Sequence, residues 1–371
     1  MTSGADAWVL GVDSGGSGVR FALGRAEPGA PTEVLVSKEP VRTGPAGIDA
    51  GQLLGQLLPA ARELLARTGA ERVAAVAVGA AGMASLGDDL RARLPSALAD
   101  SLGVTRLALA ADAVTAYAGA LGQRPGAVVA AGTGMIALGT DLTGWRRADG
   151  WGHLLGDCGG GAWIGRAGLE AALRSHDGRP GGSAALRERV EALFGPAPEL
   201  PGLLYPRTDR PAVLASFAPE VARCAPFDPV AAAILRQAAR HIADAAAAVC
   251  PDGVRTTAES SADSSTGGTT TTGSGEAGSH VSSSLLSPPT SAGESVSECE
   301  VALTGGLFRI GGPLLVPVRE ELAALLPRAR TVDAAGDPLA GAVLIAAALA
   351  RGELRLPHDP RMLCVTTEQD T

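Results

Sequence analysis

Two stretches far apart in the chain repeat one order of features: a short apolar strand, a glycine-containing turn and a returning strand. The first is AWVLGVD, SGGSG and VRFALG over residues 7–24, and the second is GAVVAAGTG followed by MIALG over residues 126–139. Apolar runs of this length, bounded by glycine, are typical of paired β-strands. The repeated pattern predicts a duplicated α/β unit rather than a single sheet or a helical bundle.

The remaining periodic segments fit the same α/β class. Leucine spacing predicts a helix over 48–68. Short apolar strands are expected at 73–79, 106–112 and 301–306, and helices at 161–175, 232–250 and 339–351. A chain of 371 residues is long enough for two domains. We predict an N-terminal domain over 1–120, a C-terminal domain over 121–352 whose last helix (339–351) packs back on the first domain, and a tail over 353–371.

The segment 251–298 differs from the rest of the chain in composition. It is rich in Ser, Thr and Gly and nearly empty of large apolar residues. Such a stretch cannot bury enough surface to offset the entropy lost on ordering. It is therefore expected to be a disordered surface insertion between the 232–250 helix and the 301–306 strand.

Charge and residue usage exclude several classes of function. A net charge of -8 argues against non-specific nucleic-acid binding and against a basic membrane-surface patch. Lys38 is the only lysine and lies outside any glycine-rich loop, so neither a Walker-type lysine nor a pyridoxal Schiff base is available. The five cysteines form no CxxC pair and do not predict a disulfide framework. With no signal-like start and no long apolar run, we expect a cytoplasmic protein without a membrane span.

Two glycine turns could hold phosphate. GVDSGGSG places Asp13 at the end of a buried strand, where this side chain could hold Mg²⁺ or the water shell of the ion. The glycine turn that follows exposes backbone N–H groups that could hold phosphate oxygens. A plain hairpin turn would explain that stretch equally well. AAGTGM, residues 130–135, sets the Thr133 hydroxyl between two glycines. Two such turns in equivalent places indicate a pair of phosphate-binding hairpins that face each other across a cleft.

Three further stretches are candidates for substrate contact. Asp112 lies where an apolar strand meets an Ala-rich helix, and it could be a helix N-cap or a general base. VALTGGLF, residues 301–308, offers a turn to which a flat base could come close. GWGHLLGDCGGGAW, residues 150–163, could be a connector, a thiol site or a loop that holds a polar ligand. In it, His153 could brace the loop or shuttle a proton, and Cys158 could be a nucleophile or a small space-filling residue.

The order of seven short motifs resembles a known family. DSGGSG, AVGAAGM, ADAVTAYAGA, AGTGM, GWGHLLGD, LTGG and DPLAGA together resemble the BadF/BadG/BcrA/BcrD-type ATPases, and more narrowly the N-acetylglucosamine kinase branch of the sugar kinase, Hsp70 and actin superfamily. The resemblance runs from Leu10 to about Arg351 apart from the insertion. It implies an α/β, two-domain actin-like ATPase fold of duplicated ribonuclease H-like domains, with a nucleotide cleft between them.

The resemblance also implies roles for individual residues, with ATP and Mg²⁺ as cofactors. It implies transfer of the γ-phosphoryl group of ATP to an amino sugar. The acceptor it favours most is N-acetylglucosamine, which would give the 6-phosphate. Asp112 would be the catalytic base and would contact the sugar, and Asp13 would bind the metal. The ATP-binding residues would be Asp13, Gly15, Gly16, Ser17, Gly132, Thr133, Gly134, Gly305 and Gly306. The sugar would be lined by Gly150, Trp151, Gly152 and Asp157.

The chain departs from the family pattern at four places. Gly18 stands where a basic residue is usual, Met135 where a serine is common, and Cys158 where a glutamate is usual. An Asn expected near Ala46 is missing. These departures bear on which sugar is accepted. They leave two alternatives open: an ATPase that activates a partner reductase, and a sugar-sensing protein of the same fold that has lost catalysis. A homodimer also stays open.

Overall fold

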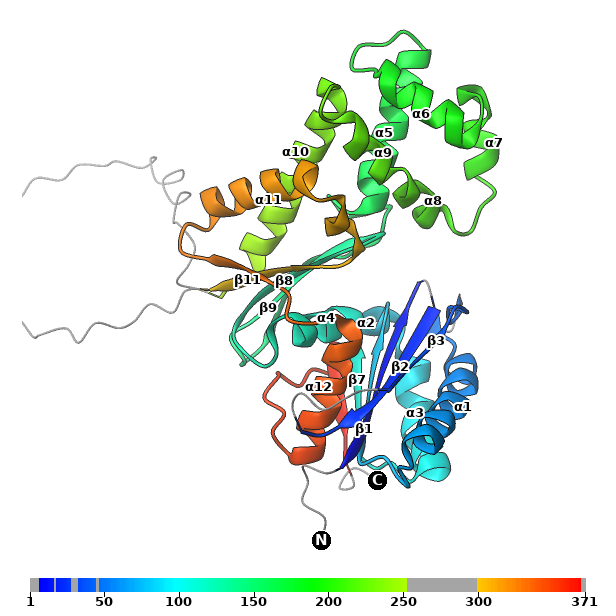
Figure 1. Ribbon diagram of the computed structural model, residues 1–371, viewed down its shortest axis with the longest axis vertical. Helices are drawn as coiled ribbons and strands as arrows, with labels where there is room; N and C mark the ends of the chain where they lie inside the picture. Colours follow the sequence, from blue (N-terminus) through cyan, green and yellow to red (C-terminus); the bar gives the residue numbers. More distant parts are fainter. Residues whose placement is uncertain (1–6, 17, 28–32, 45–46, 252–298, 368–371) are drawn as a thin grey trace, which may run out of the picture.

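Two β-sheets organise the computed structural model, which describes residues 7–16, 18–27, 33–44, 47–251 and 299–367. Residues 252–298 of the insertion expected at 251–298, together with Ser17 and Ala46, lie outside the described residues. Figure 1 shows the sheets in two parts of the molecule, one above the other. The six-stranded sheet has the order β13-β7-β6-β1-β2-β3, and the five-stranded sheet has the order β10-β9-β8-β11-β12.

The six-stranded sheet is built mainly from the first third of the chain. Its strands are β1 (Trp8–Gly15), β2 (Gly18–Arg25), β3 (Glu33–Ser37), β6 (Ala75–Ala80), β7 (Leu107–Ala111) and β13 (Leu363–Thr366). Strands β1, β6 and β7 run parallel, and β1–β2 is the predicted hairpin. Nearby lie α2 (Met83–Leu86) and the small pair β4 (Thr43–Gly44) and β5 (Gly47–Ile48). Figure 1 shows helices α1 (Ala50–Thr68) and α3 (Asp88–Leu102) on one face, and α4 (Asp112–Leu121) and α12 (Pro338–Arg351) on the other.

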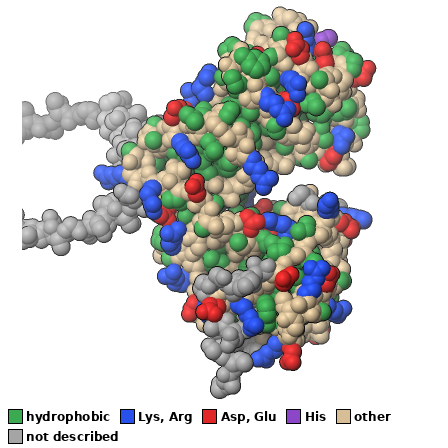
Figure 2. All heavy atoms as spheres, viewed as in Figure 1, with side chains coloured by type: hydrophobic (Ala, Val, Ile, Leu, Met, Phe, Trp, Pro, Cys, Tyr) green, Lys and Arg blue, Asp and Glu red, His purple; other side chains and the backbone are tan. Residues whose placement is uncertain are grey.

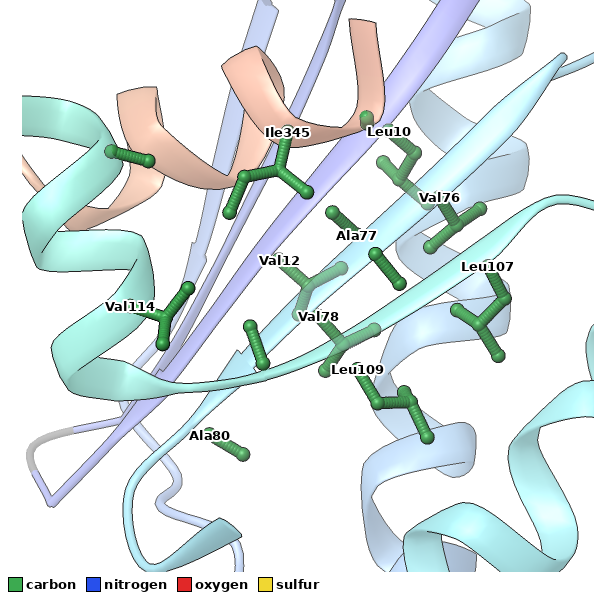
Figure 3. Packing of buried hydrophobic residues seen from close by; sticks show 14 of the residues in the cluster. Leu10, Val12, Val76, Ala77, Val78, Ala80, Leu107, Leu109, Val114 and Ile345 are labelled. Carbon is green, nitrogen blue, oxygen red and sulfur yellow. The ribbon is translucent and has the colours of Figure 1, made fainter. Parts of the chain in front are cut away.

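Small residues let these helices approach the strands closely. A Cβ on Gly11 would lie 2.7 Å from the backbone nitrogen of Val343 in α12. A Cβ on Gly79 would lie 2.6 Å from the Thr115 side chain in α4. With aromatic residues at only 3%, the core is built from Ala, Leu and Val, and Figure 3 shows the side chain of Ile345 from α12 beside those of the strands. Close backbone packing compensates for the lack of large side chains, since protein interiors are close-packed.

The five-stranded sheet carries the second predicted hairpin. Its strands are β8 (Gly126–Ala131), β9 (Met135–Thr140), β10 (Trp145–Asp149), β11 (Glu300–Thr304) and β12 (Arg330–Asp333). The hairpin is β8–β9, and β10 extends it. Helices α10 (Pro229–Val249), α11 (Gly312–Leu325) and the 3₁₀-helix η3 (Gly306–Ile310) belong to this part. Helix α4 contacts strands of both sheets, so the element that begins at Asp112 joins the two parts.

A group of helices extends the second part beyond its sheet. It comprises α5 (Gly161–His176), α6 (Ala184–Phe194), η2 (Ala197–Glu199), α7 (Leu200–Leu204), α8 (Arg210–Ser216) and α9 (Ala218–Cys224). Glu220 is buried and pairs with Arg189 and Arg223, which compensates its charge. Helix α8 packs on α5 near the start of that helix, where a Cβ on Gly161 would lie 3.1 Å from the Cβ of Ala215. This places α8 beside the glycine-rich stretch that ends at residue 161.

The predicted α/β class and the two hairpins are confirmed, and one detail needs correction. Residues 353–371 were expected to form a tail, but β13 pairs antiparallel with β7. The apolar side chain of Leu363 is buried against the core, which a four-residue run with little periodicity does not reveal. Helix α12 packs against β1, β6 and α4. The proposed boundary between domains at residue 120 stays a prediction.

Two features of the described residues concern cysteines and membranes. Cys250 and Cys299, which bracket the segment 251–298, bring their Sγ atoms to 3.0 Å in a buried contact. Within the described ranges, the structure contains no helix with the length and apolar character of a membrane span.

Candidate active site

The first glycine turn presents Asp13 at the end of β1. Asp13 stands opposite Arg20 of β2, and Arg20 donates from Nε (3.0 Å) and Nη2 (2.6 Å) to Oδ2 of Asp13. Arg20 Nη1 also donates to Asp337 Oδ2 at 2.5 Å, and Asp337 caps α12. Both bonds to Asp13 end on Oδ2, so Arg20 leaves Oδ1 to other partners. Arg20 is not evident as a site residue from the sequence, because its contact with Asp13 arises from strand register.

The backbone of this turn is open. No heavy atom lies within 4 Å of where a Cβ on Gly15 or Gly16 would stand, so a ligand could approach the main chain there. Ser17, the predicted hydroxyl of the turn, lies outside the described residues. Gly18 has φ +137°, and a Cβ there would overlap the carbonyl oxygen of Ser37. The packing of β2 on β3 therefore excludes a side chain at this position, where the family usually has a basic residue.

Asp112 lies at the same sheet edge as Asp13. The parallel register aligns Ala111 with Ala80 and Ala80 with Ser14, so the carboxyl ends of β7, β6 and β1 meet. At about 4.8 Å per strand, the two aspartates are separated by roughly 10 Å of backbone. The helix N-cap is Ala111, and Asp112 Oδ1 instead accepts the N–H of Ala113 at 2.9 Å. Helix capping at the usual position therefore does not explain this carboxylate.

The environment of Asp112 suits a general base. Burial raises its pKa from 3.8 to about 6. The charge of Asp13 adds to that rise, and the Ala113 N–H and Arg147 oppose it. A base whose pKa lies just below neutral pH is deprotonated at work yet still accepts a proton readily.

The second glycine turn is held by the N-terminus of α5. Gly132 donates its N–H to Gly134 O at 2.9 Å, Gly161 donates to Gly132 O at 2.9 Å, and Ala162 donates to Thr133 O at 2.8 Å. The positive end of a helix beside a turn of backbone amides favours an anion. A Cβ on Gly132 would meet nothing within 4 Å, whereas Met135 is buried in the core.

The turn predicted to border the nucleotide lies beside this second glycine turn. Strands β8 and β11 are parallel neighbours, so the segment after Thr304 follows the same sheet edge as Gly132. Gly305 has φ +106°, and a Cβ there would overlap the carbonyl of Ala131. Gly306 has open space at the Cβ position. The geometry brings both predicted nucleotide turns to one edge of the five-stranded sheet.

The glycine-rich loop 150–158 contacts the second glycine turn (residues 132–134) through Asp157. Asp157 adopts φ 55°, its Oδ1 accepts the Gly152 N–H at 2.9 Å, and its Oδ2 occupies the space that a Cβ on Gly134 would need. Burial raises the pKa of Asp157, and Asp149 adds to the rise. Trp151, Leu154 and Leu155 are 65%, 77% and 85% exposed, so the apolar side chains of the loop face outward rather than into a core. Hydrogen bonds to Asp149 and Asp157 hold the loop backbone, which disfavours a flexible connector.

Cys158 is not activated as a nucleophile. Burial raises the pKa of its thiol, and the carboxylates of Asp149 and Asp157 raise it further. A thiolate needs the opposite environment, with a cation or base close by. Of the three interpretations of this stretch, the thiol site is therefore the least compatible with its surroundings.

Arg147 and Asp149, at the end of β10, were missed from the sequence. Arg147 donates from Nε to Asp149 O at 3.1 Å and from Nη2 to Gly150 O, and its guanidinium carbon lies 4.5 Å from the centre of the Trp151 ring. The alternation of charged residues in WRRAD was the only available signal. Their importance comes from contacts with the following loop.

The donor set suits a nucleotide with a hydrated divalent cation. Mg²⁺ commonly takes one or two carboxylates together with phosphate oxygens and waters. Asp13 supplies one carboxylate beside an open backbone turn, and the described ranges contain no group of three or more His, Cys, Asp or Glu able to hold a metal by themselves. Figure 2 shows the surface hollowed between the part built on the five-stranded sheet and the part built on the six-stranded sheet.

Comparison with known proteins gives consistent matches. The model of the BadF/BadG/BcrA/BcrD ATPase family matches residues 10–275. An N-acetylmuramic acid/N-acetylglucosamine kinase from Clostridium acetobutylicum is 31% identical over 182 residues, which cover 46% of this chain and 55% of that protein. The chain thus spans about half the length of this curated relative.

Solved structures share the fold. A candidate N-acetylglucosamine kinase from Chromobacterium violaceum is 24% identical, with a TM-score of 0.59 over 93% of this chain and 99% of the other. One from Porphyromonas gingivalis is 13% identical, with the same TM-score and the same coverage of both chains. At these identities the likeness shows the fold alone, which is the α/β, actin-like ATPase fold that the motif resemblance implied.

Proposed function

Because the chain belongs to the BadF/BadG/BcrA/BcrD ATPase family, we propose that it is an ATP-dependent kinase that phosphorylates a hydroxyl of an amino sugar. N-acetylglucosamine, converted to its 6-phosphate, is the acceptor we propose first. The relative from Clostridium acetobutylicum, named for N-acetylmuramic acid and N-acetylglucosamine, supports this class of acceptor. ATP as phosphoryl donor argues for a reaction in the cytoplasm.

The observation that carries the proposal is Asp112. Its carboxylate lies at the carboxyl end of β7, on the same sheet edge as Asp13, and burial raises its pKa to about 6. A plain ATPase needs no base for a sugar hydroxyl at this position, whereas a kinase does. Asp157, held against the second phosphate turn, supplies a second polar group for the acceptor.

The proposed roles follow from these positions. Bound Mg–ATP would supply the electrophilic γ-phosphorus and a neutralised leaving group. The open backbones of Gly15, Gly16 and Gly132 would approach the phosphates, while Gly305 and Gly306 would border the adenosine. Asp13 would hold the metal or its water shell.

Asp112 would take the proton of the acceptor hydroxyl onto a carboxylate oxygen as the new O–P bond forms. The bond between the γ-phosphorus and the β–γ bridging oxygen would break, and the bridging oxygen would leave with ADP. Gly150, Trp151, Gly152 and Asp157 would line the acceptor. Positioning and electrostatic stabilisation, rather than covalent chemistry, supply most of the rate of such a transfer.

A panel of acceptors tests the proposal. ADP release is measured with N-acetylglucosamine, glucosamine, N-acetylmuramic acid and glucose, each against a reaction without sugar. We expect an N-acetylated amino sugar to stimulate ADP release at least tenfold over the reaction without sugar. If no sugar stimulates release, the kinase assignment is wrong, and a sugar sensor or an activator of a partner reductase becomes the better account.

A further inference from the structure

We propose that Asp149 is a positioning residue of the acceptor site, whose carboxylate holds the backbone at residues 157 and 158 and so directs the Asp157 side chain. The inference rests on the proposed function, because it takes Asp157 to face the acceptor. It goes beyond that function because it assigns the orientation of the Asp157 side chain to a residue outside the loop.

The contacts of Asp149 reach across eight residues of sequence. Its Oδ1 accepts the N–H of Asp157 at 2.6 Å, and its Oδ2 accepts the N–H of Cys158 at 2.9 Å. Each oxygen therefore holds one amide of the loop. Hydrogen bonds from backbone amides to a carboxylate are among the stronger hydrogen bonds in proteins.

The backbone around Asp149 depends on this tether. Asp149 and Asp157 adopt φ values of 58° and 55°, a left-handed conformation that costs a non-glycine residue about 1 kcal/mol or more. Gly156 is required for the contact, because a Cβ there would overlap Asp149 Oδ1 and lie 3.0 Å from the Cβ of Trp151. The two amide–carboxylate bonds offset the cost of both conformations.

The end of β10 provides a rigid base for Asp149. Asp149 pairs with Ile136 of β9, and β9 begins directly after the second phosphate turn. Arg147 holds the start of the loop, since it donates to the carbonyls of Asp149 and Gly150 and stacks on Trp151. The position of the loop relative to the phosphate turn is thus set by the β9–β10 hairpin.

These contacts hold the Asp157 side chain in one orientation. Its Oδ1 accepts the Gly152 N–H, its Oδ2 abuts Gly134, and its main chain is held by Asp149. Each carboxylate oxygen has a further lone pair for a sugar hydroxyl. Without Asp149, the loop would sample other conformations and the acceptor would lose this partner for part of the time.

Two substitutions at Asp149 and one matched control test the proposal. Asp149→Asn keeps the shape and one acceptor oxygen, and Asp149→Gly keeps the left-handed backbone but removes both acceptors. Asp141→Asn is the control, because Asp141 lies at the other end of the same hairpin and its carboxylate accepts the N–H and hydroxyl of Thr143 at 2.8 and 2.6 Å. All three variants remove a carboxylate that stabilises a turn, but only two affect residues 157 and 158.

Kinetics and hydrogen exchange are then measured on all four proteins. We expect the KM for the acceptor sugar to rise about tenfold in Asp149→Asn and more in Asp149→Gly, the size expected from weakening charge-assisted hydrogen bonds. The KM for ATP and the kinetics of Asp141→Asn should change less than about threefold, within the effect of a surface substitution. Acceptor KM values near the wild-type value at Asp149, or an equal rise in Asp141→Asn, would overturn the proposal.

Hydrogen exchange provides a readout that needs no activity. The amides of the 150–160 peptide should be protected in the wild type and in Asp141→Asn, and should exchange about tenfold faster in Asp149→Gly, since the lost hydrogen bonds are of that strength. Equal exchange in the wild type and Asp149→Gly would overturn the tether. If no sugar is phosphorylated by the wild type, the proposed function fails, while the exchange result still decides whether Asp149 holds the loop.

Discussion

At the scale of single residues, Asp112 has a position that suits a general base, but its buried environment disfavours the charged carboxylate. A carboxylate removed from water loses hydration, and the Ala113 N–H and Arg147 compensate only part of that loss. Residues placed for catalysis often lower the stability of the fold in this way. The same burial that raises the pKa of Asp112 therefore predicts a measurable effect on folding.

Asp112→Asn should stabilise the protein at neutral pH. The folded-state pKa of about 6 lies above the ordinary value of 3.8, so the wild type loses folding free energy as pH rises between these values. The asparagine never ionises, so its advantage should be absent below about pH 3 and reach at most about 3 kcal/mol above pH 7, given 1.36 kcal/mol for each pKa unit. Chemical denaturation of both proteins across this pH range measures the difference.

A loss of stability in Asp112→Asn at pH 8 would show that the carboxylate stabilises the fold. Asp141→Asn serves as the comparison, since Asp141 is exposed and its pKa is lowered by hydrogen bonds to Thr143. Because the pKa of Asp141 is lowered on folding, its carboxylate stabilises the fold at neutral pH. This contribution is lost as pH falls through the lowered pKa, which is the opposite of the pH dependence expected for Asp112. The two variants should therefore respond to pH in opposite directions.

At the scale of elements, the glycine turns that follow β8 and β11 are in close backbone contact, and they are the turns proposed to bind the nucleotide. Gly305→Ala should destabilise the protein by about 2–4 kcal/mol, because the new Cβ adds left-handed strain and overlaps the Ala131 carbonyl. The adjacent Gly306→Ala should stay within about 0.5 kcal/mol of wild type, since nothing lies within 4 Å of its Cβ position. Equilibrium unfolding measures both, and equal stabilities would contradict the described packing at this junction.

Much of the fold at this scale was predictable from the sequence. The hairpins β1–β2 and β8–β9 and helices α1, α5, α10 and α12 follow from apolar periodicity and glycine turns. Strands β12 and β13 and helices α6–α9 were missed, because short segments give too few repeats of a period and depend on packing against distant residues. The motif glycines were predictable as turns, and the structure adds which of them are open to a ligand.

The candidate site was only partly predictable for a similar reason. Asp13, Asp112 and Asp157 stand out because each ends a strand or interrupts a glycine-rich run. Arg20 makes a cross-strand pair, and Asp149 accepts hydrogen bonds from amides eight and nine residues away. Composition does not reveal such contacts. The departures at Gly18 and Met135 become intelligible only from packing, since one position excludes a side chain and the other is buried in the core.

At the scale of the whole molecule, the end of the chain returns to its beginning. Helix α12 packs on β1 and β6, and β13 completes the six-stranded sheet beside β7. Arg20 links the cap of α12 to Asp13 through ion pairs with Asp337 and Asp13. Helix α4 touches both sheets and starts at Asp112, so the proposed base lies where the two parts of the molecule join.

Transfer of a label from ATP to sugar tests the central claim most directly. ATP labelled in the γ-phosphoryl group is incubated with N-acetylglucosamine and Mg²⁺, and the products are separated for the wild type and Asp112→Asn. We expect labelled sugar phosphate in step with ADP from the wild type, and at least a hundredfold less from Asp112→Asn despite retained ATP binding, in line with the loss of a general base. ADP release without labelled sugar, or undiminished transfer by Asp112→Asn, would contradict the account.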